Sequence, residues 1–155
     1  MKTSVVLSDT HGNRRAIDEI SGILAENNYI IHLGDTSGDG GYIRSLFPGK
    51  TFLTNGNCDP VKLGEDELVI EIEGVKLLAV HGHRYSVKSN LYKLADRATE
   101  LGCQLALYGH THCAREDVIN GVTLINPGAF TKYCQKSYLY LAFAGGKFTS
   151  KIVLV

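Results

Sequence analysis

The stretch VVLSDTH, residues 5–11, decides the fold: it is an apolar run that ends in side chains able to bind a metal. A short apolar run of this kind is typical of a buried strand. Asn13 is the expected N-cap of a helix from Arg14 to about Glu26, which carries apolar residues at helical spacing. The next apolar run, Tyr29 to Leu33, completes a β-α-β unit with parallel strands, which favours an α/β fold.

The same arrangement, an apolar run followed by polar side chains, recurs four more times along the chain. These four polar segments are Gly34-Asp35, Gly56-Asn57-Cys58-Asp59, His81-Gly82-His83 and Gly109-His110-Thr111-His112. Open α/β sheets place their ligand sites at the carboxyl ends of strands, so we expect the five segments to meet. Of the six histidines only His32 lies outside them, within its strand, and we predict a structural role for it.

The predicted ligands combine carboxylates, an amide oxygen and several imidazoles, without thiolates. This mixture suits divalent Mn, Fe, Zn, Ni or Co better than a closed structural zinc site or an all-oxygen cage. Two such ions would bring four positive charges, of which Asp9 and Asp35 would neutralise two. The remaining charge would attract hydroxide and a phosphate oxyanion, and two metals about 3.5–4 Å apart stabilise both oxygens of an in-line displacement. The pattern therefore predicts phosphoester hydrolysis by a hydroxide that bridges two metals.

The rest of the chain predicts a second, β-rich half and a single domain over residues 1–155. Its expected elements are a short helix at Tyr42–Phe47, strands at Thr51–Thr54 and Leu105–Tyr108, hairpins at Leu68–Val80, Val118–Ile125 and Ser137–Val155, and a long helix from Ser86. Two sheets packed face to face with helices outside would accommodate this order.

Composition narrows the function classes. The 155 residues carry 16 basic and 16 acidic side chains, so net charge supports neither nucleic-acid nor membrane attraction. The chain opens without the apolar stretch of a signal peptide and contains no bilayer-length apolar run, which makes the cytoplasm the expected location. We expect Cys103 and Cys134 to be small buried hydrophobes.

Taken together, the five motifs resemble those of the calcineurin-like metallophosphoesterases. Gly56-Asn57-Cys58-Asp59 and Asn126-Pro127-Gly128-Ala129 are similar to the small phosphodiesterase branch, to which the retromer subunit Vps29 also belongs. The resemblance covers nearly the whole chain, from Asp9 to Ala129. It implies a sandwich of two mixed β-sheets flanked by helices.

The resemblance also implies a role for each ligand. Asp35 would bridge the two metals. Asp9, His11 and His112 would complete the coordination of the first metal. Asn57, His81 and His110 would complete that of the second metal. We expect Mn, with Ni, Zn, Fe or Co as alternatives, since sequence spacing does not select the ion.

Four residues near the expected phosphate are candidate catalytic groups: Asn57, Cys58, Asp59 and His83. Many family members carry histidine in place of Cys58, where it contacts phosphate and donates a proton. A neutral thiol is a poor acid. We therefore expect diesters or activated esters, which need less help from a proton donor, to be the better substrates. Alternatively, Cys58 is a passive neighbour. His83 would reach the phosphate or orient a metal ligand. Asp59 would orient backbone or histidine ligands.

Three other functions stay open at this point: a Vps29-like non-catalytic scaffold, a nuclease, and a phosphomonoesterase. Occupied ligand positions favour an enzyme with a small phosphodiester substrate over the scaffold, and dispersed Lys and Arg argue against the nuclease. Specificity would come from short loops such as Gly38–Gly41 and Val61–Asp66. Exposed strand edges or Tyr138-Leu139-Tyr140 could support a homodimer.

Overall fold

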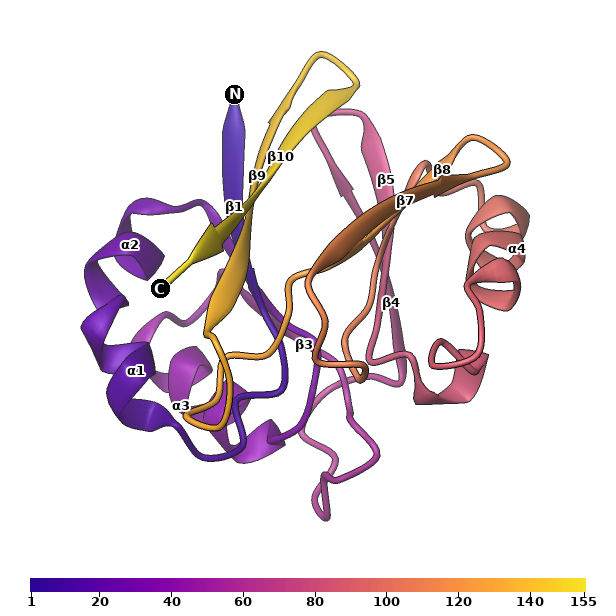
Figure 1. The fold of residues 1–155 in the computed structure, drawn as a ribbon. Coiled ribbons are helices and arrows are strands. Elements are labelled where there is room, and N and C mark those ends of the chain that lie inside the picture. Colours follow the sequence, from indigo (N-terminus) through magenta and orange to yellow (C-terminus); the bar gives the residue numbers. More distant parts are fainter.

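The computed structural model describes residues 1–155 as two mixed five-stranded sheets with four α-helices outside them (Figure 1). The first sheet has the order β10-β9-β1-β2-β3 and the second β4-β5-β6-β8-β7. This confirms the predicted α/β sandwich. The strands are β1 Lys2–Leu7, β2 Tyr29–His32, β3 Thr51–Leu53, β4 Glu67–Ile72, β5 Val75–Val80, β6 Leu105–Leu107, β7 Arg115–Ile119, β8 Val122–Asn126, β9 Ser137–Ala144 and β10 Lys147–Leu154.

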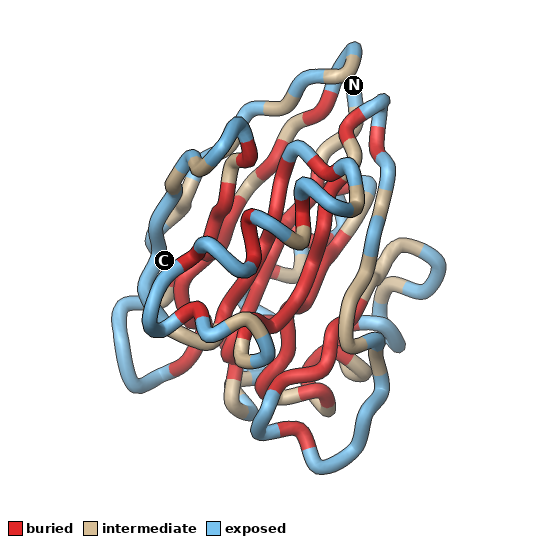
Figure 2. The backbone as a smooth tube through the Cα atoms, turned by 90° about the vertical axis from the view of Figure 1, so that its right-hand side faces the viewer, coloured by how far each residue is buried: buried red, intermediate tan, exposed pale blue.

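Three apolar layers hold the sandwich together. The middle layer lies between the sheets and contains Val6, Leu77 and Leu139, all fully buried. The helices α1 (Arg14–Glu19), α2 (Ser21–Glu26) and α3 (Ser37–Leu46) cover the outer face of the first sheet, and α4 (Tyr92–Glu100) covers the second (Figure 1). Buried positions follow the strands, whereas exposed ones lie on helix backs and loops (Figure 2). No helix is long and apolar enough to cross a membrane.

Each sheet contains three neighbouring parallel strands, and these position the site. In the first sheet β1 pairs with β2 and β2 with β3; in the second β5 pairs with β6 and β6 with β8. Parallel neighbours bring their carboxyl ends to one edge, which lies at the lower end of the molecule in Figure 1. The predicted hairpins β4–β5, β7–β8 and β9–β10 are all present.

Three predicted helices differ from those observed. The first is interrupted at Ile20, and Asn13 occupies its N-cap position without a side-chain cap hydrogen bond. The segment Gly38–Gly41, predicted as a loop, belongs to α3; Gly40 is required there because a Cβ would lie 2.1 Å from Leu53 Cδ1. The helix predicted from Ser86 begins at Tyr92 instead, since Ser86 has a left-handed φ of 53°.

The cysteines divide into one buried and three exposed residues. Cys103 is buried, as predicted, in the layer between the second sheet and α4. Cys134 is exposed, so the prediction of a buried hydrophobe is wrong there. It lies in the loop before β9, where no secondary structure covers it.

Candidate metal centre

The structure gathers the polar segments that follow β1, β2, β3, β5 and β6 at one end of the sandwich. Asp9 comes two residues after β1, and its backbone N–H donates to Gly34 O (2.9 Å), which ties it to the segment after β2. Across the two sheets, His81 Nδ1 lies 2.8 Å from Leu33 O and His110 N–H donates to Asp9 Oδ2 (3.0 Å). Both sheets therefore contribute to one constellation.

Asp9, His11 and His112 form the first group with metal-binding geometry. Their candidate ligand atoms lie within 4.8 Å of one another. Asp9 Oδ1 is 3.0 Å from His112 Nε2 and 3.8 Å from His11 Nε2. The Asp9 side chain is fully buried, whereas His112 is nearly half-exposed, so this group opens toward solvent.

Asp35 and His81 form the second group, which shares Asp9 with the first. All three side chains are buried. His81 Nε2 lies 3.4 Å from Asp35 Oδ2 and 3.0 Å from Asn57 Oδ1. Asp9 thus belongs to both groups, although the family resemblance implies only Asp35 as a bridging ligand.

The orientation of His81 fits a metal ligand. Its Nδ1 faces the carbonyl oxygen of Leu33, which can only accept a hydrogen bond, so Nδ1 carries a proton. Nε2 faces two more oxygens, those of Asp35 and Asn57, so a proton on Nε2 is donated to them. A metal ion can take the place of that proton, because the neutral ring has a lone pair on Nε2.

Unpartnered polar atoms provide an independent test of whether these residues fit a metal. Asp9 Oδ1 and His11 Nε2 are buried and have no hydrogen-bond partner. Leaving a buried polar group unsatisfied costs about 1–3 kcal/mol, and more for a charged group. Two such atoms facing each other, together with His112 Nε2, fit a divalent ion with mixed imidazole and carboxylate ligands.

Charge coupling is strongest in the buried group. Burial alone would raise the pKa of Asp35, but the hydrogen bond and charge of His81 hold it far below its usual range. Burial opposes protonation of His81 in turn, yet its contacts with Asp35 and the charge of Asp9 raise its pKa. Before a metal binds, Asp35 is therefore a carboxylate that attracts positive charge to this position.

Asp35 is held in place by the segment after β3. The Cys58 N–H donates to Asp35 Oδ1 (2.9 Å). Asp59 Oδ2 accepts from the backbone N–H groups of Asp35 (3.0 Å) and Gly56 (2.7 Å). A Cβ at Gly56 would lie 1.9 Å from Asp35 Oδ1, so only glycine fits. Asp59 thus joins two strand-end segments through their backbones.

The ligand segments share an uncommon backbone conformation. Five candidate ligands have left-handed φ angles, namely Asp9 (53°), His11 (44°), Asp35 (47°), His110 (68°) and His112 (63°). For residues other than glycine this region costs on the order of 1 kcal/mol each and is concentrated at functional sites. The backbone thus turns sharply after each strand and directs the side chains toward a common point.

His110 and His83 lie beside the buried group without belonging to it. The His110 ring centroid is 5.1 Å from that of His81, and the His83 centroid is 5.5 Å from it. Burial, followed by the charge of His81, lowers the pKa of both His83 and His110. His83 Nδ1 is buried and unpartnered. Both rings are therefore neutral bases at the edge of the centre.

A polar cluster beneath the centre was missed by sequence reasoning. Thr10 Oγ1 donates to Asp39 Oδ2 (2.6 Å) and lies 3.0 Å from His32 Nε2, while Gly12 N–H also donates to Asp39 Oδ2 (2.7 Å). We call Thr10, His32 and Asp39 the closed network. Asp39 was hidden in a Gly-rich segment predicted as a loop.

Asn126 and Ser8 are two further supports; Asn126 belongs to a motif noted in the sequence, but its contacts could not be read from it. Asn126, at the end of β8, donates through Nδ2 to Gly109 O and Thr111 Oγ1, both at 3.0 Å. Ser8 Oγ donates to Asp9 Oδ2 (2.5 Å). Asn126 thereby fixes the turn that carries His110 and His112, a role for which its position at a predicted strand end was the available signal.

The family model for the calcineurin-like phosphoesterase superfamily domain matches residues 1–145. With nearly the whole chain matched, and with the sandwich fold and ligand constellation described above, the protein belongs to the calcineurin-like phosphoesterases, a family of metal-dependent phosphoesterases. The predicted family is therefore confirmed.

Three relatives illustrate its place in the family. The chain is 33% identical over 128 residues to the probable metallophosphoesterase YsnB of Bacillus subtilis, covering 81% of this chain and 73% of YsnB. It is 28% identical over 157 residues to the phosphodiesterase MJ0936 of Methanocaldococcus jannaschii, covering 83% and 84% of the two chains. Vps29 of Entamoeba histolytica, solved with Zn²⁺, has the same fold, with a TM-score of 0.77, 18% identity and 98% coverage of both chains.

Proposed function

We propose that this protein is a phosphodiesterase that hydrolyses a small phosphodiester at a centre of two divalent metal ions, with Mn the expected ion. The observation that carries the proposal is the convergence of unpartnered Asp9 Oδ1 and His11 Nε2 with the buried Asp35–His81 pair. These atoms can act as ligands at two adjacent metal positions. Asp9 belongs to both positions, and Asp35 belongs to the one that contains His81. Two divalent ions, when bound, would supply Lewis acidity and hydroxide near neutral pH.

The roles of the residues follow from their positions. His11 and His112 would hold one ion at the open side, and His81 with Asn57 the other at the buried side. Asp35 and Asp9 leave two of the four metal charges uncompensated, which favours a phosphate oxyanion as the bound group. His83 and His110 are neutral neighbours that can accept a proton or a hydrogen bond from the substrate.

Cys58 supports a diester over a monoester substrate. Its side chain is exposed beside Asn57, at 3.6 Å from Asn57 Nδ2. Burial, followed by interaction with Asp35, raises the pKa of the Cys58 thiol, so it stays protonated at neutral pH and is a weak proton donor. Without a stronger acid, esters with good leaving groups should react faster than alkyl monoesters. The similarity to phosphodiesterase MJ0936 agrees with this preference.

A non-catalytic scaffold is the second candidate, because Vps29 shares the fold and its Entamoeba form was solved with Zn²⁺. Metal binding alone therefore does not separate the two functions. Turnover does.

The test is an assay of metal-stripped protein on bis-p-nitrophenyl phosphate, followed by separate addition of Mn, Ni, Zn and Mg. We expect turnover to return with at least Mn and to be lost in the Asp35→Asn variant. Asp18→Asn, an exposed carboxylate on α1, is the control and should behave like the wild type. Metal binding without turnover for every ion would instead support the scaffold.

A further inference from the structure

A cavity of about 460 Å³ lies between the segment Val87–Tyr92 and strand β7. This volume lies within the range of small-molecule sites. Half of its twelve lining residues are hydrophobic, including Leu91 and Ile119. The remainder are polar, among them Lys88 and Arg115. The cavity therefore suits a ligand with a flat apolar body and polar edges.

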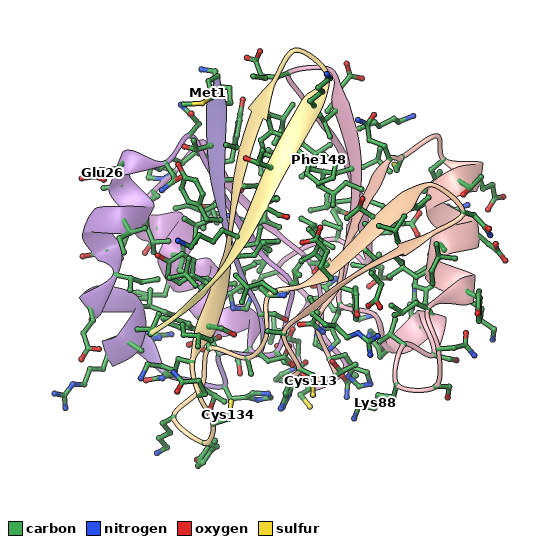
Figure 3. All side chains as sticks on the ribbon, turned by 45° about the horizontal axis from the view of Figure 1, so that its top comes forward. Met1, Glu26, Lys88, Cys113, Cys134 and Phe148 are labelled. Carbon is green, nitrogen blue, oxygen red and sulfur yellow. The ribbon has the colours of Figure 1, made fainter.

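The cavity adjoins the metal centre without being part of it. Thr111 lines it and stands between the candidate ligands His110 and His112. Lys88 and Cys113, which both line the cavity, lie at the same end of the molecule in Figure 3. A phosphodiester bound at the metals could thus place one of its two ester arms here.

One buried polar atom on the cavity wall has no partner in the protein. Tyr108 is 1% exposed, and its hydroxyl makes no hydrogen bond. A phenol hydroxyl can donate a hydrogen bond, and no acceptor in the protein receives this one. Because a buried unsatisfied hydroxyl is costly, a bound group that accepts a hydrogen bond would gain from this position.

The other polar groups of the cavity also favour an acceptor-rich ligand. The ammonium of Lys88 can only donate. Asp117 is the one acidic side chain on the wall, and it is already bound by Arg115 at 2.7 and 2.8 Å.

We propose that this cavity binds one ester arm of the substrate, and that this arm is a ring system of nucleoside size with hydrogen-bond acceptors on its edge. Tyr108 Oη is its buried anchor. This inference deepens the proposed phosphodiesterase function. It rests on that function in one respect, namely that the bound group is part of the substrate. The cavity as a binding site stands on its own geometry.

Binding can be tested without hydrolysis, by titrating thymidine into metal-stripped protein and following backbone amide shifts by NMR. We expect shifts in residues 87–92 and 115–119, and weaker ones with benzyl alcohol, whose ring has no acceptors. Ser89→Trp should fill the cavity and weaken binding more than about 10-fold, and Tyr108→Phe should weaken it about 3- to 10-fold, as expected for one lost hydrogen bond. Controls are Ser45→Trp on the exposed face of α3 and Tyr138→Phe, a buried tyrosine of the first sheet.

Turnover provides the second arm of the test. With metal restored, both cavity variants should lower the ratio of kcat/KM for thymidine 5′-p-nitrophenyl phosphate to that for methyl p-nitrophenyl phosphate, mainly through KM. Two results would overturn the proposal even if the protein hydrolyses diesters. One is the absence of thymidine-induced shifts in the cavity residues, and the other is shifts of the same size in Ser89→Trp and in Ser45→Trp. Thymidine binding in the cavity without hydrolysis of any diester would uphold the site and refute only the phosphodiesterase function.

Discussion

Two buried polar clusters lie side by side at the carboxyl ends of β1 and β2, and they differ in whether their hydrogen bonds are complete. In the closed network, Asp39 accepts from both Thr10 and Gly12, and His32 bonds on both ring nitrogens. In the metal centre, Asp9 Oδ1 and His11 Nε2 have no partner. The first cluster is satisfied by the protein alone, whereas the second leaves two buried atoms without hydrogen bonds.

The two kinds of histidine make the same contrast. His32 Nδ1 accepts from Gly34 N–H at 3.1 Å, so the neutral ring carries its proton on Nε2 and donates to Thr10. Burial lowers the pKa of His32 to about 4, which keeps the ring neutral. His81, by comparison, directs Nε2 at the oxygens of Asp35 and Asn57, a position that a proton or a metal ion can occupy. The two histidines therefore differ in what Nε2 faces: a hydroxyl in His32, and a carboxylate with an amide oxygen in His81.

The largest effect is expected for Asp35→Asn compared with Asp39→Asn. Loss of the Asp35 charge should lower kcat/KM for a diester by more than about 10²-fold, the upper end of the effect for residues that merely orient metal ligands. Asp39→Asn should retain most activity per folded molecule, because Asp39 belongs to the closed network. Steady-state kinetics with the metal-restored variants would measure both, and equal losses would erase the distinction between the clusters.

Metal addition should stabilise only the chain with an intact centre. At free metal equal to about 100 times Kd, one site binding only the folded state contributes about 2.7 kcal/mol to the free energy of unfolding. Thermal denaturation of the wild type with Mn and with a chelator should show this gain, and Asp35→Asn should show less of it. A gain of equal size in Asp35→Asn would place the bound ion elsewhere.

Asp39→Asn should instead destabilise the fold itself. The neutral amide oxygen accepts from Thr10 and Gly12 more weakly than the carboxylate does, and losing the charge assistance of these two buried hydrogen bonds costs about 2 kcal/mol. Urea denaturation of metal-stripped protein should reveal the loss as a lower free energy of unfolding for Asp39→Asn than for the wild type. The opposite order of stabilities would contradict this assignment.

Cys58→His should add a proton donor beside the candidate metal centre. We expect the rate on alkyl phosphomonoesters to rise about 10-fold or more, within the span that general acid catalysis supplies. The ratio of alkyl monoester to bis-p-nitrophenyl phosphate turnover is the readout, with Cys58→Ser as the control. Unchanged monoester rates in Cys58→His would mean that Cys58 is a passive neighbour.

The smallest effect near neutral pH should come from His32. The unfolded chain takes up a proton near the ordinary pKa of 6.5, while the folded chain does not until about pH 4. Between these values the unfolded state binds more protons, so the free energy of unfolding should decrease as pH falls, by at most about 1.4 kcal/mol per pH unit from this group. NMR titration of the His32 ring gives its pKa directly. A value near 6.5 would show that the network is not closed.

The sequence could predict the strands and the candidate ligands because both are local features. Apolar runs followed by Asp or His identified the strand ends, and the hairpins at Asn120-Gly121 and Gly145-Gly146 followed from turn chemistry. The start of α3 could not be predicted, since its glycines disfavour helix, and the close packing of Gly40 against Leu53 is visible only in the fold.

The closed network and the sharing of Asp9 between both groups depend on contacts between residues that are far apart in the sequence. Thr10 and Asp39 are 29 residues apart, and Asp9 and His110 are 101 apart. No spacing rule connects such positions. The ligand assignments inferred from the family resemblance remain predictions, and Asp9 in particular contributes to more of the centre than they implied.

The most direct measurement is the number of Mn ions bound per chain, determined by calorimetric titration of metal-stripped wild type, Asp35→Asn and Asp39→Asn. The account predicts two ions in the wild type and in Asp39→Asn, and loss of at least one in Asp35→Asn. No bound ion in the wild type, or the same number in Asp35→Asn as in the wild type, would contradict the assignment of the unpartnered cluster as a two-metal centre.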